Sequence, residues 1–327
     1  LALLLGTPAA FADVSNAEIW ANMRGYLESS GYSVTATETV SGDTLTISDI
    51  IATIPMYGGD EDMIAKIPEL GLVDQGDGTV RIEVPEETQM EFSTTVESGE
   101  KIDGAIAYTQ DGFDMIASGE PDNLTYAYSA NSIALELIKL VVDGTAISDD
   151  IGRASAQLVD VSGNSTMTEG ENRTNVQTLN TGALSYDLAF TDPDGNANVA
   201  ALGALRGLKS EGTMTLPITA PDGADPSAML AAGLKYNAGI TYEGGNLDLS
   251  FDGPDGAGTI SSSSTGGLFN ISFAPEGLVY DVSQTGLAVN ALLPDIPFPI
   301  TLNMAESKFN LAMPLTKSDE EQGFDLG

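Results

Sequence analysis

The chain has 327 residues and contains neither cysteine nor histidine. Without cysteine, no disulfide framework and no thiolate metal site can form. Without histidine, imidazole metal ligands, histidine general bases and the hydrolytic triads built on them are excluded. Paired carboxylates, a lysine or a metal bound through oxygen remain as catalytic groups. The composition therefore predicts a protein that is not an enzyme.

Basic side chains are also scarce, with 12 lysines and arginines against 48 acidic residues and a formal net charge of −36. Such a surface repels phosphate backbones, so a nucleic-acid partner is excluded. It also repels anionic lipid headgroups unless divalent cations intervene. The simplest interpretation is that the charge keeps an exported protein soluble in saline surroundings, and calcium binding is the alternative.

The first 12 residues, LALLLGTPAAFA, form an apolar run that ends in Ala10-Phe11-Ala12. Small residues in this pattern are typical of a signal-peptidase site, and the polar Asp13 follows. We therefore interpret residues 1–12 as a signal-peptide remnant, which predicts a periplasmic location, with an extracellular one as the alternative. The run is too short to span a bilayer, so no stable transmembrane segment is expected after cleavage. A buried N-terminal strand is the other interpretation.

One helix is well signalled near the N-terminus. Ser15 and Glu18 match a capping box, and the apolar residues that follow at helical spacing up to Gly31 are Ile19, Trp20, Met23 and Leu27. Trp20, the single tryptophan, is expected to anchor this helix to a sheet. A shorter helix is predicted over residues 226–232, which begin with proline and precede a glycine.

Most of the remaining chain predicts β-strands. Apolar and polar residues alternate in short segments between Asp-Gly and Gly-Gly turns, for example Thr44–Ser48, Thr79–Val84, Leu124–Ser129, Leu247–Phe251 and Leu268–Phe273. The segment Ser132–Val142 fits a helix or a strand, and we favour a strand. The expected fold class is mainly β: an antiparallel meander with one N-terminal helix and few other helices.

Two gapless alignments indicate an internal duplication. PDNLTYAYSANSIALEL from Pro121 matches PEGLVYDVSQTGLAVNA from Pro275. At the same offset, GYSVTATE from Gly31 matches SYDLAFTD from Ser185. The duplication predicts two tandem β units that form a sandwich, a roll or a groove.

The duplication also suggests how the chain is divided. After the signal-peptide remnant, residues 13–185 would hold the N-terminal helix and the first β unit. Residues 186–327 would hold the second β unit, which the absence of a stop feature suggests is truncated.

Asp192, Asp194 and Asn196 lie together in the segment DPDGN and offer the oxygen ligands that calcium prefers. The spacing does not match an EF-hand loop, because glycine comes too early and no closing glutamate follows. A hairpin turn is the simpler interpretation, so these residues are weak calcium candidates. No other cofactor and no catalytic residue is predicted.

The proline-rich segment at residues 292–304 has two interpretations. It is either an exposed apolar lip for a lipid or a partner, or a connection between strands whose prolines protect a sheet edge. The second interpretation is favoured.

Three segments carry a resemblance to a known family: AEIWANMRGYLESSGYSVTATETVSGDTLTISDI, SSSSTGG from Ser261, and LPDIPFPITLNMAESKFNLAMPL. They resemble the uncharacterised Gram-negative periplasmic family designated domain of unknown function (DUF) 2125. The resemblance implies an exported, acidic protein with a pattern of β repeats, in a family whose members usually continue further than this chain. It implies no catalytic residues.

These observations favour a non-catalytic periplasmic binding or scaffold protein that shelters a lipid or another apolar ligand on a curved β-sheet, by analogy with periplasmic lipid carriers. The alternative is a structural or interaction module of an envelope assembly, with an envelope protein as partner and no small ligand. A third class is a carboxylate-dependent glycan hydrolase, which needs two acids in an aromatic-lined cleft. An unfilled apolar face would favour the first class, and a closed sandwich with a polar exterior the second.

Overall fold

The computed structural model describes residues 14–56, 62–96, 99–148, 152–192, 196–221 and 226–314, so the predicted signal peptide lies outside the described residues. The helices are α1 (Asn16–Ser29) and α2 (Pro226–Ala231). The strands are β1 (Ser33–Ser41), β2 (Thr44–Ile54), β3 (Met63–Asp74), β4 (Val80–Glu83), β5 (Glu87–Thr95), β6 (Lys101–Asp111), β7 (Asp114–Glu120), β8 (Asn123–Val142), β9 (Thr145–Ile147), β10 (Gly152–Glu169), β11 (Asn172–Thr191), β12 (Asn198–Pro217), β13 (Lys235–Tyr242), β14 (Gly244–Gly253), β15 (Gly256–Ser264), β16 (Gly266–Ala274), β17 (Gly277–Leu292) and β18 (Ile300–Met313).

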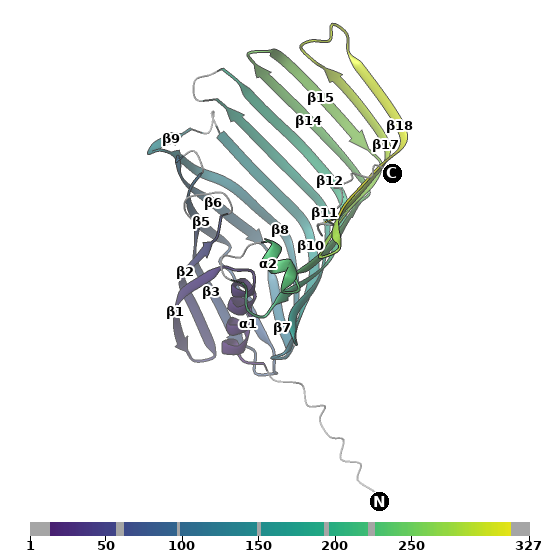
Figure 1. Ribbon diagram of the computed structural model, residues 1–327. Coiled ribbons are helices and arrows are strands. Elements are labelled where there is room, and N and C mark those ends of the chain that lie inside the picture. The colour runs from purple at the N-terminus through teal and green to yellow at the C-terminus, as the bar shows by residue number, and fades with distance from the viewer. Residues whose placement is uncertain are drawn as a thin grey trace, which may run out of the picture.

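The 18 strands form one antiparallel sheet (Figure 1). β1, β2 and β3 pair in sequence order, and β3 then pairs with both β5 and β4, which lie end to end. β5 then pairs with β6, and β4 pairs with β7. The long strand β8 pairs with β6 and β7 along one edge and with β9 and β10 along the other. β10, β11 and β12 continue the meander.

The arrangement of β3 to β8 recurs in β12 to β17. β12 pairs with β14 and with β13. β14 then pairs with β15, and β13 pairs with β16. The long β17 pairs with both β15 and β16 along one edge and with β18 along the other. The pairing register corresponds as well. Ala117 is the partner of Tyr126, and the aligned Ile271 is the partner of Tyr280. In the same way, Ala107 is the partner of Glu136, and the aligned Ser261 is the partner of Asn290. Connectivity and register therefore agree with the alignment that starts at Pro121 and Pro275.

The other alignment, from Gly31 and Ser185, matches strands that differ in how many of their edges are paired. Gly31 leads into β1, which pairs only with β2 among the described strands, whereas Ser185 lies within β11, which is paired along both edges. By connectivity, the counterpart of β1 is β10. The boundary between residues 185 and 186 falls inside β11, and the sheet continues across it without a break in pairing.

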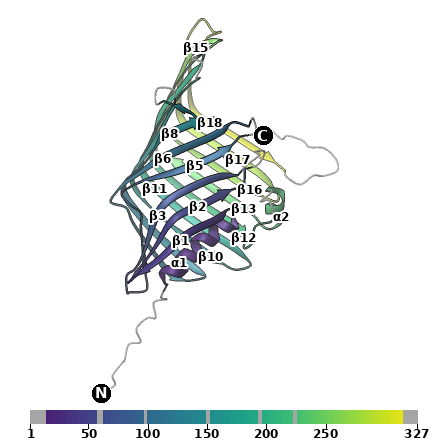
Figure 2. The same ribbon diagram turned by 90° about the vertical axis from the view of Figure 1, so that its left-hand side faces the viewer.

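The sheet is curved, and α1 lies inside the curve with the N-terminal strands in front of the C-terminal strands in Figure 2. The Tyr26 hydroxyl at the end of α1 donates to the Met214 sulfur on β12 at 3.5 Å. The Ser29 hydroxyl donates to the Ile218 carbonyl, just after β12, at 3.2 Å. Since α1 also packs on β1, β2 and β3, it joins the two sides of the curve.

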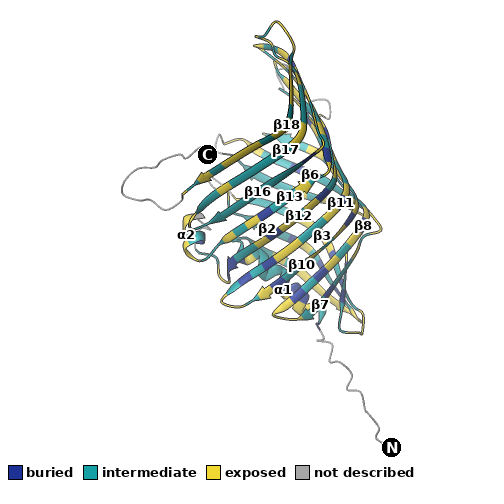
Figure 3. Ribbon diagram, turned by 90° about the vertical axis from the view of Figure 1, so that its right-hand side faces the viewer, coloured by how far each residue is buried: buried dark blue, intermediate teal, exposed yellow. Residues whose placement is uncertain are grey.

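The buried core surrounds α1, as the burial colours of Figure 3 show. Ile19 and Trp20 of the helix are buried and pack against strand residues that share one face of the sheet. These residues are Leu45, Ile47, Leu70, Leu72, Val80, Ile82, Ala117, Leu124, Tyr126 and Met167. We refer to the face of the sheet that α1 covers as the inner face.

Two polar contacts fix α1 on this face. Arg173 of β11 is buried, donates to the Ser29 hydroxyl at 2.7 Å and forms an ion pair with Glu169 at the end of β10. Tyr126 of β8 donates to the side-chain oxygen of Asn22 at 2.9 Å. Burial raises the pKa of Tyr126 well above that of a free phenol. Each contact joins buried polar groups that are costly to leave unpaired.

A line of irregular residues crosses the sheet and divides it in two. Asp49, Asp160, Gly207 and Gly286 lie in four different strands and have positive φ angles of 50°, 53°, 56° and 57°. The pairs Thr181–Leu208 and Ala183–Arg206 flank Gly182 and Gly207, and a Cβ on Gly182 would lie 2.8 Å from the Asp160 carboxylate, so the irregularities align across neighbouring strands. We refer to this line as the crease, to the part of the sheet that holds α1 as the helical half, and to the other part as the open half.

The crease changes which residues of a strand face inward. In β10 the odd-numbered Val161 and Met167 are buried on the helical half, whereas even-numbered residues of 152–158 are the less exposed ones on the open half. β2 changes parity in the same way between Ile47 and Ile50. A residue in the left-handed region departs from the twofold repeat of an extended strand, so the alternation restarts with the other parity.

The predicted fold class is confirmed: the protein is mainly β and antiparallel, with an N-terminal helix and one further short helix. Helix α1 has the predicted capping box, in which Ser15 and Glu18 bond each other's backbone. Trp20 anchors it as expected, because its indole N–H donates to the carboxylate of Glu38 on β1 at 2.8 Å. The ambiguous segment Ser132–Val142 is strand and forms the second part of β8.

Gly286 tests the crease. A Cβ at this position would lie 2.9 Å from the Thr265 methyl group and 3.2 Å from its Cβ, in a backbone conformation that disfavours side chains. We expect Gly286→Ala to lower the free energy of unfolding in urea by about 1 kcal/mol more than Gly42→Ala. Gly42 has a similar φ of 61° but open space around it, so it isolates the contact from the backbone strain. Equal losses would contradict the close packing of the crease.

Tyr126 predicts a loss of stability in alkali. The unfolded phenol ionises near its ordinary pKa, of about 10, while the buried one stays protonated, so the free energy of unfolding falls as pH rises above about 10. Tyr126→Phe should reduce that slope by up to about 1.4 kcal/mol per pH unit. Urea titrations between about pH 8 and 11 measure the slope, and an unchanged slope in the variant would contradict the assignment.

Candidate functional site

The inner face of the open half is apolar and uncharged. Side chains that lie directly opposite each other in an antiparallel sheet share a face, so the pairing register identifies its members. They include Ala52, Ile54, Ala65, Ile67, Met90, Phe92, Gly104, Ile106, Tyr108, Ile133, Leu135, Leu137, Gly152, Ala154, Ala156, Leu158, Leu184, Tyr186, Leu188, Phe190, Val199, Ala201, Gly203, Leu205, Leu247, Leu249, Phe251, Ile260, Ser262, Val289, Ala291, Ile300 and Leu302, together with the uncharged polar residues Thr88, Thr94 and Gln110. We name this set the open apolar face.

The outer face of the same strands is polar. Its charged residues include Lys66, Glu87, Glu91, Lys101, Asp103, Asp111, Glu136, Lys139, Arg153, Asp187, Arg206, Asp248 and Asp252. Arg153 and Asp187 form an ion pair across β10 and β11 at 3.2 Å. Every charge of the open-half strands is thus directed away from the open apolar face.

Nothing in the described part of the chain fills this face as α1 fills the helical half. Leu135, Leu188, Phe190 and Val199 are 40%, 38%, 45% and 47% exposed, whereas Leu72 beneath α1 is fully buried. The face also forms a depression of about 250 Å³, lined mainly by apolar side chains of β6, β8, β10 and β11. Exposed apolar area of this kind is costly in water and is typical of surfaces that bind a ligand or a partner.

The dimensions of the face exceed those of a pocket for one small molecule. A stretch of eight residues in an extended strand is about 26 Å long, and a dozen strands spaced by about 4.8 Å are on the order of 50 Å wide. Tyr108 lies opposite Leu135 on this face, and burial raises the pKa of its phenol. The face therefore suits long apolar groups laid along the strands.

The apolar surface continues into the helical half beneath the C-terminal strands, beyond the reach of α1. There the inner positions are aromatic or aliphatic: Tyr236, Ile240, Phe269, Ile271, Phe273, Leu278, Tyr280, Val282, Phe309 and Leu311. The rings of Phe269 and Tyr280 lie 6.0 Å apart. Phe309 at the last described strand is 51% exposed. This second apolar area lies on the same face of the sheet, and Gln284 and Ser307 separate it from the open apolar face along β17 and β18.

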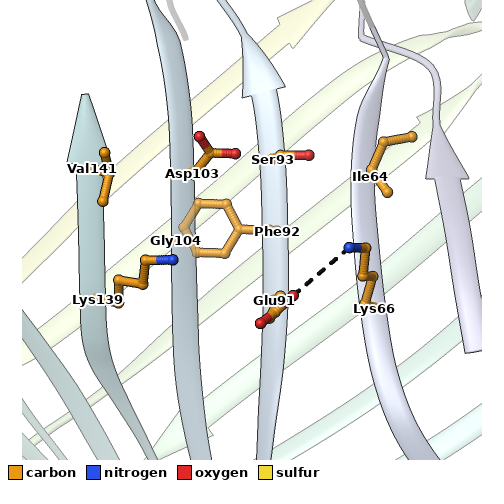
Figure 4. A pocket seen from close by; sticks show the side chains of 9 residues that line it. All are labelled: Ile64, Lys66, Glu91, Phe92, Ser93, Asp103, Gly104, Lys139 and Val141. Atoms are coloured by element: carbon orange, nitrogen blue, oxygen red, sulfur yellow. Dashed lines mark ion pairs between the residues drawn. The ribbon is translucent and has the colours of Figure 1, made fainter. Parts of the chain in front are cut away.

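A second depression, of about 320 Å³, lies on the outer face and is shown in Figure 4. Lys66 pairs with Glu91 at 3.8 Å, and Asp103 pairs with Lys101 at 3.0 Å. Phe92 is the one aromatic residue among those that line it, and its ring, which lies against Gly104, also lines the depression on the inner face. Both carboxylates are engaged in ion pairs, and the depression is not the aromatic-lined cleft that glycan hydrolysis requires.

The weak calcium candidates fall at the connection between β11 and β12. The Asp192 backbone N–H donates to the Ala197 carbonyl at 2.7 Å, which closes a hairpin. Asn196 lies in the same connection, and Asp194 lies outside the described residues. Within the described ranges, no three acidic side chains are grouped closely enough to hold a metal ion. Calcium binding here stays an untested prediction.

The sequence pointed to an apolar inner face but did not identify its members. Alternation within single segments, such as Leu247–Phe251, assigns the correct residues to one face. Alternation followed across Asp160 or Gly207 assigns the wrong ones, because parity changes at the crease. Single Asp and Gly residues within the strands, such as Asp160 and Gly207, were the available signal, but their alignment depends on pairing that only the fold shows.

Comparisons of the chain with protein-family models, with curated proteins and with solved structures find no match. The resemblance to the DUF2125 family thus stays a sequence-based prediction. No helix in the described part of the chain is long and apolar enough to cross a bilayer.

The difference between the two halves can be measured by stability. Leu72→Ala removes a fully buried side chain and should lower the free energy of unfolding by about 2–5 kcal/mol. Leu188→Ala removes one that nothing covers, and the loss should stay below about 1 kcal/mol. Urea unfolding of both variants makes the comparison. A loss for Leu188→Ala as large as that for Leu72→Ala would show that the open apolar face is filled.

Proposed function

We propose that this protein is a non-catalytic periplasmic binding protein that shelters the acyl chains of a lipid, or a similarly elongated apolar ligand, on its open apolar face. The observation that carries the proposal is the contrast between the two faces of the open half. The inner face holds no charged residue and stays exposed, while the outer face of the same strands carries the charges.

The shape supports a ligand that lies along the sheet. The face runs across many strands without a charged interruption, so several chains fit side by side. A curved sheet shields such chains from water on one side, and the opposite wall of the curve shields them further (Figure 1). The periplasmic location rests on the predicted signal peptide, and the non-catalytic assignment rests on the absence of histidine and cysteine.

We further propose that the sheet arose by internal duplication of the unit represented by β3 to β8. The support is the shared connectivity and register of β12 to β17. Duplication widens an apolar face without a second helix to cover it. A larger uncovered face is useful to a lipid-binding protein and a liability to a protein without a ligand.

A structural module of an envelope assembly is the second candidate. In the helical half, α1 packs against both sides of the curved sheet, and such a filled core favours a rigid structural role. An envelope protein that covers the open apolar face would then take the place of the lipid. The experiment below distinguishes the two.

Native mass spectrometry of protein purified from the periplasm, with organic extraction of bound material, tests the lipid proposal. We expect the wild-type protein to carry a recurring lipid mass. Leu188→Asp places a charge on the open apolar face and should reduce the lipid-bound fraction at least about tenfold, since an unpaired carboxylate against acyl chains is strongly unfavourable.

The matched control is Leu202→Asp. Leu202 is 54% exposed on β12, but it lies opposite Asp187 and therefore on the outer face. This variant should retain the lipid. A lipid-free wild-type mass, or equal loss of lipid in both variants, would contradict the proposal, and co-purification of a stoichiometric protein instead would support the envelope module.

A further inference from the structure

The connection between β17 and β18 lies at the outer end of the open half. It consists of residues 293–299, with the sequence LPDIPFP, and we refer to it as the tip. Figure 1 shows it at the top of the sheet, away from α1. At its base Ala291 pairs with Ile300, and both residues belong to the open apolar face. The tip is therefore continuous with the proposed binding surface.

The tip and the strand ends beside it expose apolar side chains. Phe298, Leu292 and Leu302 are 62%, 53% and 44% exposed, and the prolines of the tip are exposed as well. Single exposed apolar residues are common in folded proteins, but these gather at one end of an uncovered apolar face. The one charged residue of the tip is Asp295, and the tip contains no lysine or arginine. A contact through the tip would thus be apolar rather than electrostatic.

The backbone of the tip has few N–H groups that require water. Pro294, Pro297 and Pro299 have no N–H to donate. The Ile296 N–H donates to the Leu293 carbonyl at 3.1 Å, which closes a turn with Pro294 at its second position. An N–H without a partner is costly to transfer out of water. This composition therefore lowers the cost of placing the tip in an apolar environment.

The prolines of the tip do not shield the edge of the sheet. All three precede Ile300, and β18 itself contains no proline, although the segment does connect two strands as the favoured interpretation of the sequence expects. Pro294 instead packs on the neighbouring hairpin between β14 and β15, because a Cβ on Gly256 would lie 2.7 Å from the Pro294 Cβ. The tip is thus held in place at the end of the open half.

We propose that the tip inserts into the surface of a lipid bilayer and is the place where acyl chains pass between the bilayer and the open apolar face. This inference rests on the proposed function, because it names the source of the lipid and its route. A protein partner would need an interface of about 20–30 residues on each side, which is more than the tip offers. A bilayer contact needs only a few inserted apolar side chains, since its strength scales with the buried apolar area.

The position of the tip gives the chains a short path. Ile300 and Leu302 continue from the tip into the open apolar face, and their partners Ala291 and Val289 belong to the same face. An acyl chain that enters here stays in contact with apolar side chains, whereas a chain that crosses water meets an unfavourable intermediate state. The tip is therefore expected to set the rate of lipid transfer and to leave the equilibrium affinity of the face unchanged.

A dye attached to the tip measures insertion. The chain contains no cysteine, so Pro297→Cys provides a single attachment site for an environment-sensitive dye. We expect its emission to shift to shorter wavelength when phosphatidylcholine vesicles are added. The shift should persist at about 1 M salt, where the Debye length is only about 3 Å, because the contact is apolar.

The matched control is Glu276→Cys, in the exposed connection between β16 and β17 at the opposite end of the strands. It should show no shift. An absent shift at position 297, or an equal shift at both positions, would overturn the inference. A shift that grows with protein concentration in the absence of vesicles would also overturn it, and would assign the tip to a contact between copies of this chain.

Phe298→Asp tests the route of the lipid. Transfer of pyrene-labelled phosphatidylcholine from quenched vesicles to this variant should be at least about tenfold slower than to the wild-type protein, because a carboxylate must be desolvated to enter the bilayer. The lipid-bound fraction at equilibrium should stay at the wild-type value, since the open apolar face is unchanged. The control Val279→Asp places the same charge on β17, at a residue that is 38% exposed and lies opposite Ala312 on the outer face. It should keep the wild-type rate.

The outcomes distinguish this inference from the proposed function. Uptake of lipid at the same rate by the wild-type protein and by Phe298→Asp would overturn the inference alone. Insertion of the tip into vesicles without any uptake of lipid would overturn the proposed function, and would leave the tip as a bilayer contact without a role in lipid entry.

Discussion

A sheet that forms a single layer must cover its apolar face, and the described part of this chain has little with which to do so. There, one helix of 14 residues and one short helix accompany 18 strands. Helix α1 solves the problem for the helical half by packing Ile19 and Trp20 between both sides of the curved sheet. The open half is left with an apolar surface that stays exposed in the described structure, and the rest of the molecule is organised around this surface.

The crease makes the division into two halves possible. Left-handed residues such as Asp160 and Gly207 interrupt several strands on one line, and strand pairing continues on both sides. Backbone hydrogen bonds therefore hold the sheet together while the side-chain pattern restarts. The glycines on this line have a second role, because a Cβ on Gly182 would lie 2.8 Å from the Asp160 carboxylate. The line is closely packed, which fixes the shape of the curve.

The charged side chains of the open half are also arranged by face. The strands of the open half direct their charged residues outward, where acids and bases pair, as Arg153 does with Asp187. A lipid bound on the inner face would thus meet no charge along its chains.

Sequence by itself determined the mainly β class, helix α1 with its capping box at Ser15, and the strand character of Ser132–Val142, because these depend on local spacing and turn chemistry. It also determined the charge and the absence of histidine and cysteine. It did not determine the single sheet, the end-to-end strands, or the pairing across residue 185, where a domain boundary was expected. Only the tertiary structure decided which residues face inward, because the parity change at the crease and the alignment of Asp160, Gly182 and Gly207 arise from pairing between strands distant in sequence.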